Sequence, residues 1–161
     1  MPAPRTVHSA PRLPEPRRSS FWNRWLPIQY RIIRWLDPLV RPIWSTTGLG
    51  NVVELQVPGR KTGTTRRVLL GLLRDGDLWF LGHPNGDVPW TLNLEAAGTA
   101  LIALRPNSAI AVRASRLTQG DLRDRAIAAT SQHVFPGNLV YRLARAHIRA
   151  VGTYFRIEVG D

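Results

Sequence analysis

The sequence predicts an α+β fold in which a small antiparallel β-barrel carries helices on its outside. Apolar runs of strand length follow one another through the middle of the chain, and Arg74-Asp75-Gly76-Asp77, a sequence typical of a hairpin turn, joins two of them. Adjacent hairpins argue against a doubly wound parallel sheet, in which strands and helices alternate. The 161 residues leave room for one such domain and an additional arm.

The expected elements follow in the order strand, strand, strand, helix, strand, strand, helix, helix, strand. Pro58-Gly59 ends the first strand with a turn signal. Pro89 suits the first turn of a helix and Gly98 suits its C-terminal cap. The predicted strands are residues 52–57, 67–73, 78–82, 99–104, 110–117 and 154–159, and the predicted helices are residues 89–97, 121–130 and 139–150.

Composition divides the chain into three parts. Residues 1–20 contain five Pro and only Val7 and Leu13 as large apolar residues, which predicts a disordered Pro/Arg-rich arm. Residues 21–44 predict an amphipathic helical segment, and residues 45–161 predict the barrel domain.

The segment 21–44 has two interpretations. On a helical wheel, Arg24, Arg31, Arg34 and Arg41 fall on one side, and most of the apolar residues, Trp25 among them, fall on the other. Such a helix either packs its apolar face on the barrel or lies on an anionic membrane surface without spanning it. We therefore expect a cytoplasmic protein that is either free or peripheral at the inner face of the membrane.

Composition also excludes several classes of site. Cys is absent, so the chain has no disulfide, no thiolate zinc site and no cysteine nucleophile. The histidines show no metal-ligand spacing, and we expect no metal. A net charge of +11 would suit nucleic acid, but the arginines are dispersed and no helix-turn-helix or RNA-binding motif is present. A nucleic-acid-binding domain is therefore the weakest of the alternatives.

The first chemical motif is the run Gly59-Arg60-Lys61-Thr62-Gly63-Thr64-Thr65-Arg66-Arg67 between two predicted strands. Two glycines enclose cations and hydroxyls, so that backbone N–H groups and positive charges can converge on an anion. The spacing is not that of a Walker A loop, and no helix follows. The alternative is an ordinary solvated turn.

The second motif runs from Gly82 to Leu94 and reads as a tight loop followed by a short helix. The N-terminus of that helix offers unpaired N–H donors. His83 in the loop is a candidate proton donor, although it also fits an ordinary polar loop residue. Trp90 would either cover a bound ring or belong to the core.

Together, the G-R-K-T-G loop, the hairpin and the P-W-x-x-N-L segment resemble the deazaflavin (F420)-dependent nitroreductase and quinone reductase family. The resemblance covers about residues 49–104 and implies a split β-barrel. It also implies that the first motif holds the phosphate and acidic tail of the coenzyme and that the second faces the deazaflavin ring. The cofactor-binding residues implied are Arg60, Lys61, Thr62, Arg66, Asn85, Gly86, Trp90 and Asn93.

The resemblance implies an oxidoreductase that binds coenzyme F420 rather than FMN. It would transfer hydride from the reduced coenzyme to a small electron-poor acceptor, a quinone or a nitroaromatic. The cofactor carries this chemistry, so no catalytic acid–base pair is required. Where many members have Pro-Leu-Tyr, this chain has Leu69-Leu70-Gly71 and no visible tyrosine-rich pocket. A non-catalytic split-barrel carrier of a lipid or cofactor is the main alternative, and a homodimer is compatible with either.

Overall fold

The computed structural model describes residues 50–105, 107–132 and 137–160. In this part of the chain, seven strands form one antiparallel sheet in the order β2-β1-β5-β6-β7-β4-β3. The strands are β1 (Val52–Pro58), β2 (Thr65–Gly71), β3 (Leu73–Asp75), β4 (Leu78–His83), β5 (Thr99–Arg105), β6 (Ser108–Leu117) and β7 (Thr153–Val159). The helices are α2 (Pro89–Ala97), α3 (Asp121–Ala129), α4 (Gly137–Leu143) and α5 (Arg145–Val151), with a 3₁₀ turn at Thr130–Gln132.

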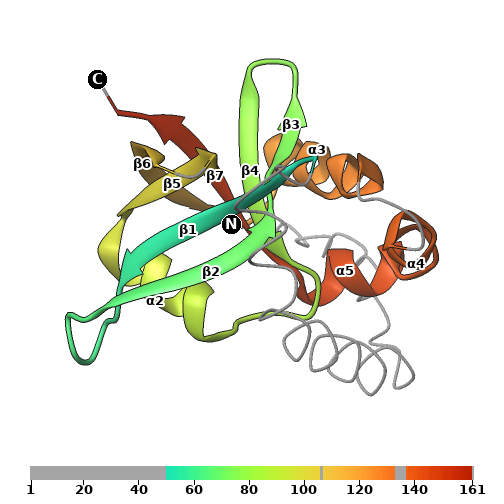
Figure 1. Cartoon of the computed structure of the whole chain (residues 1–161). Coiled ribbons are helices and arrows are strands. Elements are labelled where there is room, and N and C mark those ends of the chain that lie inside the picture. The colour runs from blue at the N-terminus through green and yellow to red at the C-terminus, as the bar shows by residue number, and fades with distance from the viewer. Residues whose placement is uncertain (1–49, 106, 133–136, 161) are drawn as a thin grey trace, which may run out of the picture.

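One residue, Leu72, joins the two ends of this sheet. β2 and β3 are its first and last strands, yet only Leu72 separates them in the chain, so the sheet has to curl into a barrel (Figure 1). Asn51 holds Leu72 on both sides, because the Leu72 N–H donates to the Asn51 carbonyl at 2.8 Å and Asn51 Nδ2 donates to the Leu72 carbonyl at 3.2 Å. The prediction of a single strand over 67–73 was therefore wrong, since the chain leaves one edge of the sheet and enters the other at Leu72.

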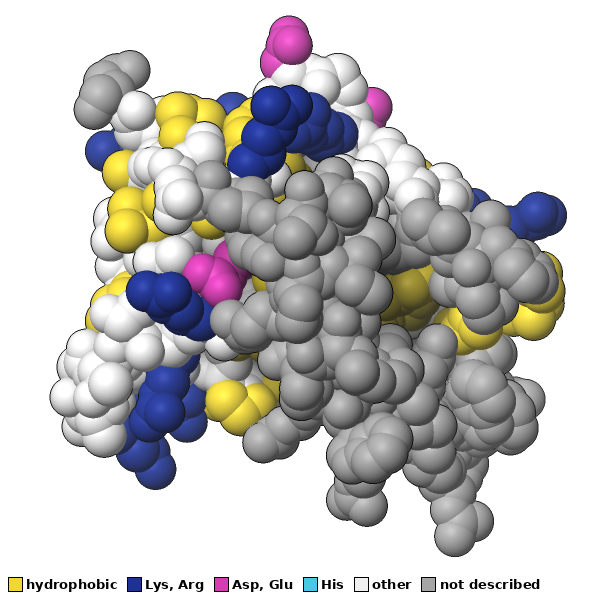
Figure 2. All heavy atoms as spheres, in the orientation of Figure 1, with side chains coloured by type: hydrophobic (Ala, Val, Ile, Leu, Met, Phe, Trp, Pro, Cys, Tyr) yellow, Lys and Arg dark blue, Asp and Glu magenta, His cyan; other side chains and the backbone are white. Residues whose placement is uncertain are grey.

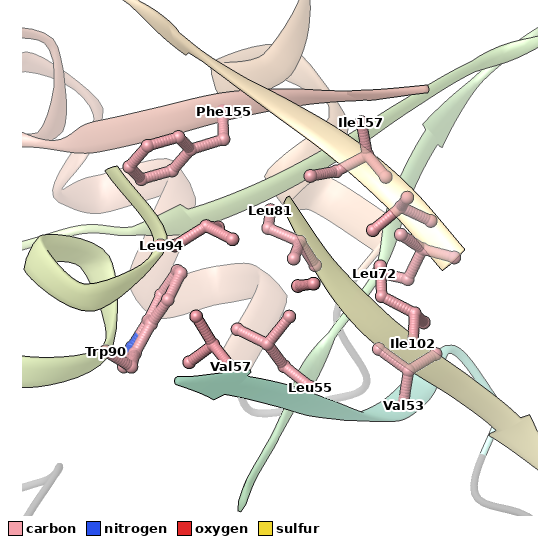
Figure 3. Close-up of a cluster of buried hydrophobic side chains, with 12 residues drawn as sticks. Val53, Leu55, Val57, Leu72, Leu81, Trp90, Leu94, Ile102, Phe155 and Ile157 are labelled. Carbon is pink, nitrogen blue, oxygen red and sulfur yellow. The ribbon is translucent and has the colours of Figure 1, made fainter. Parts of the chain in front are cut away.

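The barrel interior is filled by the inward side of each strand. Val53, Leu55 and Val57 alternate with outward residues along β1, and each is at most 3% exposed. Leu94 of α2 packs with them, and the ring of Trp90 lies 6.3 Å from that of Phe155 (Figure 3). Helix α2 thus contributes two large side chains to the core, and this fixes it against β1.

Helices α3, α4 and α5 lie outside the barrel and cover a second core. Phe80 and Tyr154 project outward from β4 and β7 and pack against Ile127 of α3 and Ile148 of α5. The helix predicted over 139–150 is divided into α4 and α5 at Ala144. The Ala144 N–H donates to Val140 of α4 and the Ala144 carbonyl accepts from Ile148 of α5, both at 2.9 Å, so this one residue joins the two helices.

The prediction of an α+β antiparallel barrel with flanking helices is confirmed. The predicted arm (1–20) and amphipathic segment (21–44) lie outside the described residues, and the domain boundaries stay predictions. Among the helices described, none combines the length and the apolar character needed to cross a bilayer.

Candidate functional site

The turn between β1 and β2 is held in shape by its own backbone. The Gly59 N–H donates to the Thr64 carbonyl at 3.0 Å, and the Gly63 N–H donates to the Gly59 carbonyl at 2.8 Å. Gly63 has φ +67°, a conformation that side chains disfavour, which explains the second glycine of the motif. The turn therefore presents Arg60, Lys61 and Thr62 on an ordered backbone, and all three are exposed.

Arg60 connects this turn to helix α2. Its backbone N–H donates to Asn93 Oδ1 at 3.2 Å, and its guanidinium Nη1 donates to the same oxygen at 3.3 Å. Asn93 is buried (8% exposed), so its amide oxygen is a fixed point for the turn. The structure thus brings together two of the predicted site residues that lie 33 positions apart in the chain.

Arg66 and Arg67 are the second and third residues of β2 and point to opposite faces of the sheet. Arg66 pairs with Val57, whose side chain is in the barrel core, whereas Arg67 pairs with Gln56 on the outside. Arg67 lies 3.9 Å from Glu54, which is also on the outer face. Arg66 is thus the one of the two that shares the side of the sheet on which α2 packs. Figure 2 shows Lys and Arg side chains gathered over the end of this hairpin.

The second motif forms a loop over residues 83–88 between β4 and α2, which we call the ring loop. His83 Nδ1 lies 3.3 Å from the Asn85 N–H and 3.2 Å from the Gly86 carbonyl, so a neutral ring accepts from the first and a ring with a proton on Nδ1 donates to the second. Burial lowers the pKa of His83, and the Gly86 carbonyl and Asp87 oppose this shift only in part. Gly86 has φ +81°, and a side chain there would approach the Val151 carbonyl.

Asn85 is held from the other side by α5. His147 Nε2 lies 3.0 Å from Asn85 Oδ1, and His147 is only 1% exposed. Burial lowers the pKa of His147, and the neutral ring donates its Nε2 proton to the amide oxygen. Its Nδ1 has no hydrogen-bond partner among the described residues. The predicted residue Asn85 thus rests between two histidines, of which the sequence interpretation used only His83.

Asp87 anchors the end of the ring loop. Thr153 donates to Asp87 Oδ1 at 2.7 Å, and Arg116 Nη2 donates to both carboxylate oxygens at 3.0 and 3.1 Å. Arg116 also donates to Glu95 of α2 at 2.5 Å, so one guanidinium bridges the loop and the helix. Burial alone would raise the pKa of Asp87, but the bonds from Thr153 and Arg116 outweigh it and lower that pKa.

These anchors were missed by sequence reasoning because they come from distant strands. Arg116 and Thr153 lie in β6 and β7, and only the strand order brings them beside Asp87. The Thr91 hydroxyl, one turn into α2, accepts from the Val88 N–H at 2.9 Å and donates to the Val88 carbonyl at 2.8 Å. This last arrangement had a local signal, a hydroxyl residue three positions after the residue that precedes the helix.

The other predicted site residues lie in different surroundings. Lys61 and Thr62 are at the exposed tip of the turn. Among the described residues, the only side-chain bond of Thr62 is the one that its Oγ1 accepts from the Thr64 N–H at 3.4 Å. Trp90 is 7% exposed and packs in the barrel core, which favours the core interpretation of this residue. Over residues 50–105, 107–132 and 137–160, no three His, Asp or Glu side chains are grouped so as to hold a metal ion.

This arrangement suits an elongated anionic ligand. The turn offers exposed cations on a fixed backbone, and Arg60 is oriented by Asn93 toward α2. The ring loop is anchored at His83, Asn85 and Asp87, so its backbone can support a flat group without being reorganised. Such a donor set would suit a ligand that carries anionic groups beside a flat ring.

No protein-family model and no curated protein matches the sequence, but solved structures resemble the fold. An F420-H2 dependent reductase, FDR-A, has a TM-score of 0.51 at 19% identity, over 67% of this chain and 94% of its own. A protein solved as a domain-swapped dimer has a TM-score of 0.53 at 16% identity, over 79% and 99% of the two chains. The heme-storage protein HutZ from Vibrio cholerae has a TM-score of 0.53 at 12% identity, over 78% and 91%. At these identities the likeness concerns the fold, and the chain is an α+β split-barrel protein.

Proposed function

We propose that this chain is an oxidoreductase that binds coenzyme F420 between the β1–β2 turn and the ring loop. The observation that carries the proposal is the double hydrogen bond from Arg60 to Asn93, because it joins the predicted phosphate-binding turn to the helix that follows the predicted ring-binding loop. The F420-H2 dependent reductase among the structures of similar fold supports this choice over FMN.

In this proposal each group of residues has one task. Arg60, Lys61, Thr62 and Arg66 hold the phosphate and acidic tail by charge-assisted hydrogen bonds. The backbone of Asn85 and Gly86 supports the ring, while His147 and Asp87 keep the loop in place. When bound, the reduced deazaflavin supplies the hydride, and the acceptor is a small electron-poor molecule such as a quinone or nitroaromatic.

His83 is the candidate proton donor beside the ring loop. Its pKa is lowered by burial, so at neutral pH it is an uncharged imidazole. A neutral ring still carries one proton, which leaves Nδ1 as the acceptor for the Asn85 N–H when the proton is on Nε2. With the proton on Nδ1, the ring would donate to the Gly86 carbonyl instead.

Binding is tested by titrating the fluorescence of F420 with the wild type and with the double variant Arg60→Ala/Lys61→Ala. We expect the variant to bind at least about tenfold more weakly, since each lost charged hydrogen bond is worth about 1.5–3 kcal/mol. Arg67→Ala is the matched control, because that side chain lies on the outer face, and it should bind like the wild type. Equal dissociation constants for wild type and double variant would remove the turn from the site.

Turnover is tested separately, by following the absorbance of reduced F420 with menadione and with a nitroaromatic. The proposal requires oxidation that depends on the acceptor and is slowed in the double variant. The second candidate is a non-catalytic carrier of a lipid or cofactor, which the heme-storage protein of similar fold favours. Tight F420 binding with no oxidation by either acceptor would leave the carrier.

Three further points belong to the proposal. Homodimer formation is supported by the neighbour solved as a domain-swapped dimer, and sedimentation velocity measures it directly. Contact of residues 21–44 with an anionic membrane, and a cytoplasmic location, rest on the sequence pattern alone.

A further inference from the structure

Helices α4 and α5 carry an exposed surface that the proposed coenzyme site does not use. In Figure 1 they lie on the opposite side of the molecule from the β1–β2 turn. We define this α4–α5 surface by Leu139, Arg142, Leu143, Arg145 and Arg149, all of which are exposed. Leu143 is 66% exposed and Leu139 is 47% exposed, and few large apolar side chains of the described residues are as open.

Within each helix, the exposed residues share one side. Leu139, Arg142 and Leu143 of α4 are three and four residues apart, and Arg145 and Arg149 of α5 are four residues apart. Ala144 joins the two helices directly, since its N–H donates to Val140 of α4 and its carbonyl accepts from Ile148 of α5. The opposite side, with Ala144 and Ile148, is buried against the barrel.

The charge of the surface has one sign and is incompletely neutralised. Neither α4 nor α5 contains an acidic residue. Arg149 lies 3.5 Å from Asp124 of α3, but Arg142 and Arg145 take part in no ion pair among the described residues. Two unpaired guanidinium groups therefore stand beside two exposed leucines.

We infer that the α4–α5 surface binds the headgroup region of an anionic membrane. Leucines beside a row of arginines match the two components of such an interface, an acyl boundary and a layer of phosphates. A second copy of this chain fits less well, because a two-fold contact would place two arginine rows against each other. A nucleic acid would use the arginines but leave the exposed leucines without a partner. This inference does not depend on the proposed function.

The test is sedimentation of the full chain with vesicles, either of phosphatidylcholine alone or containing about a third phosphatidylglycerol. The wild type should bind only the anionic vesicles, and binding should fall steeply between about 20 mM and about 500 mM NaCl as the charges are screened. Arg142→Ala/Arg145→Ala should reduce the partition coefficient by about 30-fold. Leu139→Ser/Leu143→Ser should reduce it by about tenfold.

Matched controls distinguish binding by this surface from nonspecific binding through the net positive charge or through any exposed leucine. Arg105→Ala/Arg113→Ala removes two exposed arginines elsewhere, and Leu101→Ser removes a leucine that is 42% exposed on the outer face of β5. Both should bind vesicles nearly as the wild type does, and circular dichroism should show that every variant is folded. The inference is overturned if the wild type ignores anionic vesicles at low salt, or if the paired arginine variants bind equally. It is also overturned if the leucine variant changes only self-association in sedimentation velocity.

Discussion

Gly82 lies in β4 directly opposite Tyr154 of β7. A Cβ at position 82 would come within 2.3 Å of two atoms of the tyrosine ring, and that ring is 1% exposed and cannot swing into solvent. We expect Gly82→Ala to lower the free energy of unfolding by about 1–3 kcal/mol, the cost typical of overpacking. Urea denaturation measures it.

Gly160→Ala is the comparison for this prediction. The nearest atom to a Cβ there is 3.5 Å away, an ordinary van der Waals contact, and the residue is exposed. Its unfolding midpoint should stay close to that of the wild type. If the two variants were equally stable, Tyr154 would have room that the described packing does not give it.

Single residues also show where the sequence was informative about the site. Arg66 and Arg67 are identical neighbours, and only the register against β1 tells that one shares the core side with Val57 and the other faces outward. The motif that contains Arg60 and the one that contains Asn93 could be recognised separately, because each is local. Their contact could not, since it depends on where α2 packs.

At the scale of elements, the guanidinium group of one strand residue links the ring loop to helix α2. Arg116 of β6 bridges Asp87 of the loop and Glu95 of α2. Its partners are about 40% exposed, so solvent weakens each pair, and we expect Arg116→Ala to lower the free energy of unfolding by about 1 kcal/mol or less. Amide exchange in residues 85–88 should nevertheless accelerate clearly, because the loop loses a bidentate anchor.

Arg113→Ala provides the control for this experiment, since Arg113 is exposed on the same strand. Its loop amides should exchange at the wild-type rate. Uniform acceleration over the whole barrel in Arg116→Ala would instead show that the bridge supports global stability rather than the loop.

Most elements could be predicted from the sequence because their signals are local. Alternation, turn sequences and caps predicted the bounds of five strands and two helices to within about two residues, the usual uncertainty of element ends. The division of residues 67–73 at Leu72 could not be predicted, because an uninterrupted apolar run gives no sign that its two halves pair with different strands. The bridge made by Arg116 had no local signal either.

For the whole molecule, two buried histidines make stability depend on pH. Burial lowers the pKa of His83 and of His147 in the folded protein, whereas the unfolded chain has the ordinary value of about 6.5. Below that pH the unfolded state binds protons that the folded state does not, so stability is greatest above about 6.5 and falls as the pH decreases. Each histidine can contribute a slope of up to about 1.4 kcal/mol per pH unit.

Chemical denaturation at pH values between about 5 and 8 tests this dependence. His147→Gln keeps an amide donor near Asn85 Oδ1 but does not titrate, so its loss of stability toward acid should be smaller than that of the wild type. The pKa of Asp87 is also lowered, but the stability that this adds is constant over this window, because it is lost only as the pH falls below the ordinary value of about 3.9. An unchanged slope in the variant would mean that His147 is not responsible.

Leu72 finally sets a condition on the register of the strands when the barrel forms. Around the rest of the circumference, neighbouring strands are joined by ladders that could in principle slip, whereas between β2 and β3 the chain itself makes the join. A shift of one residue in any ladder would move the core side chains of a strand to its outer face. It would also offset β2 from β3 by one residue, and Leu72 could no longer connect them. The linkage at Leu72 therefore selects against strand pairings with a shifted register, because β2 and β3 can both join the sheet only when the registers around the barrel are consistent.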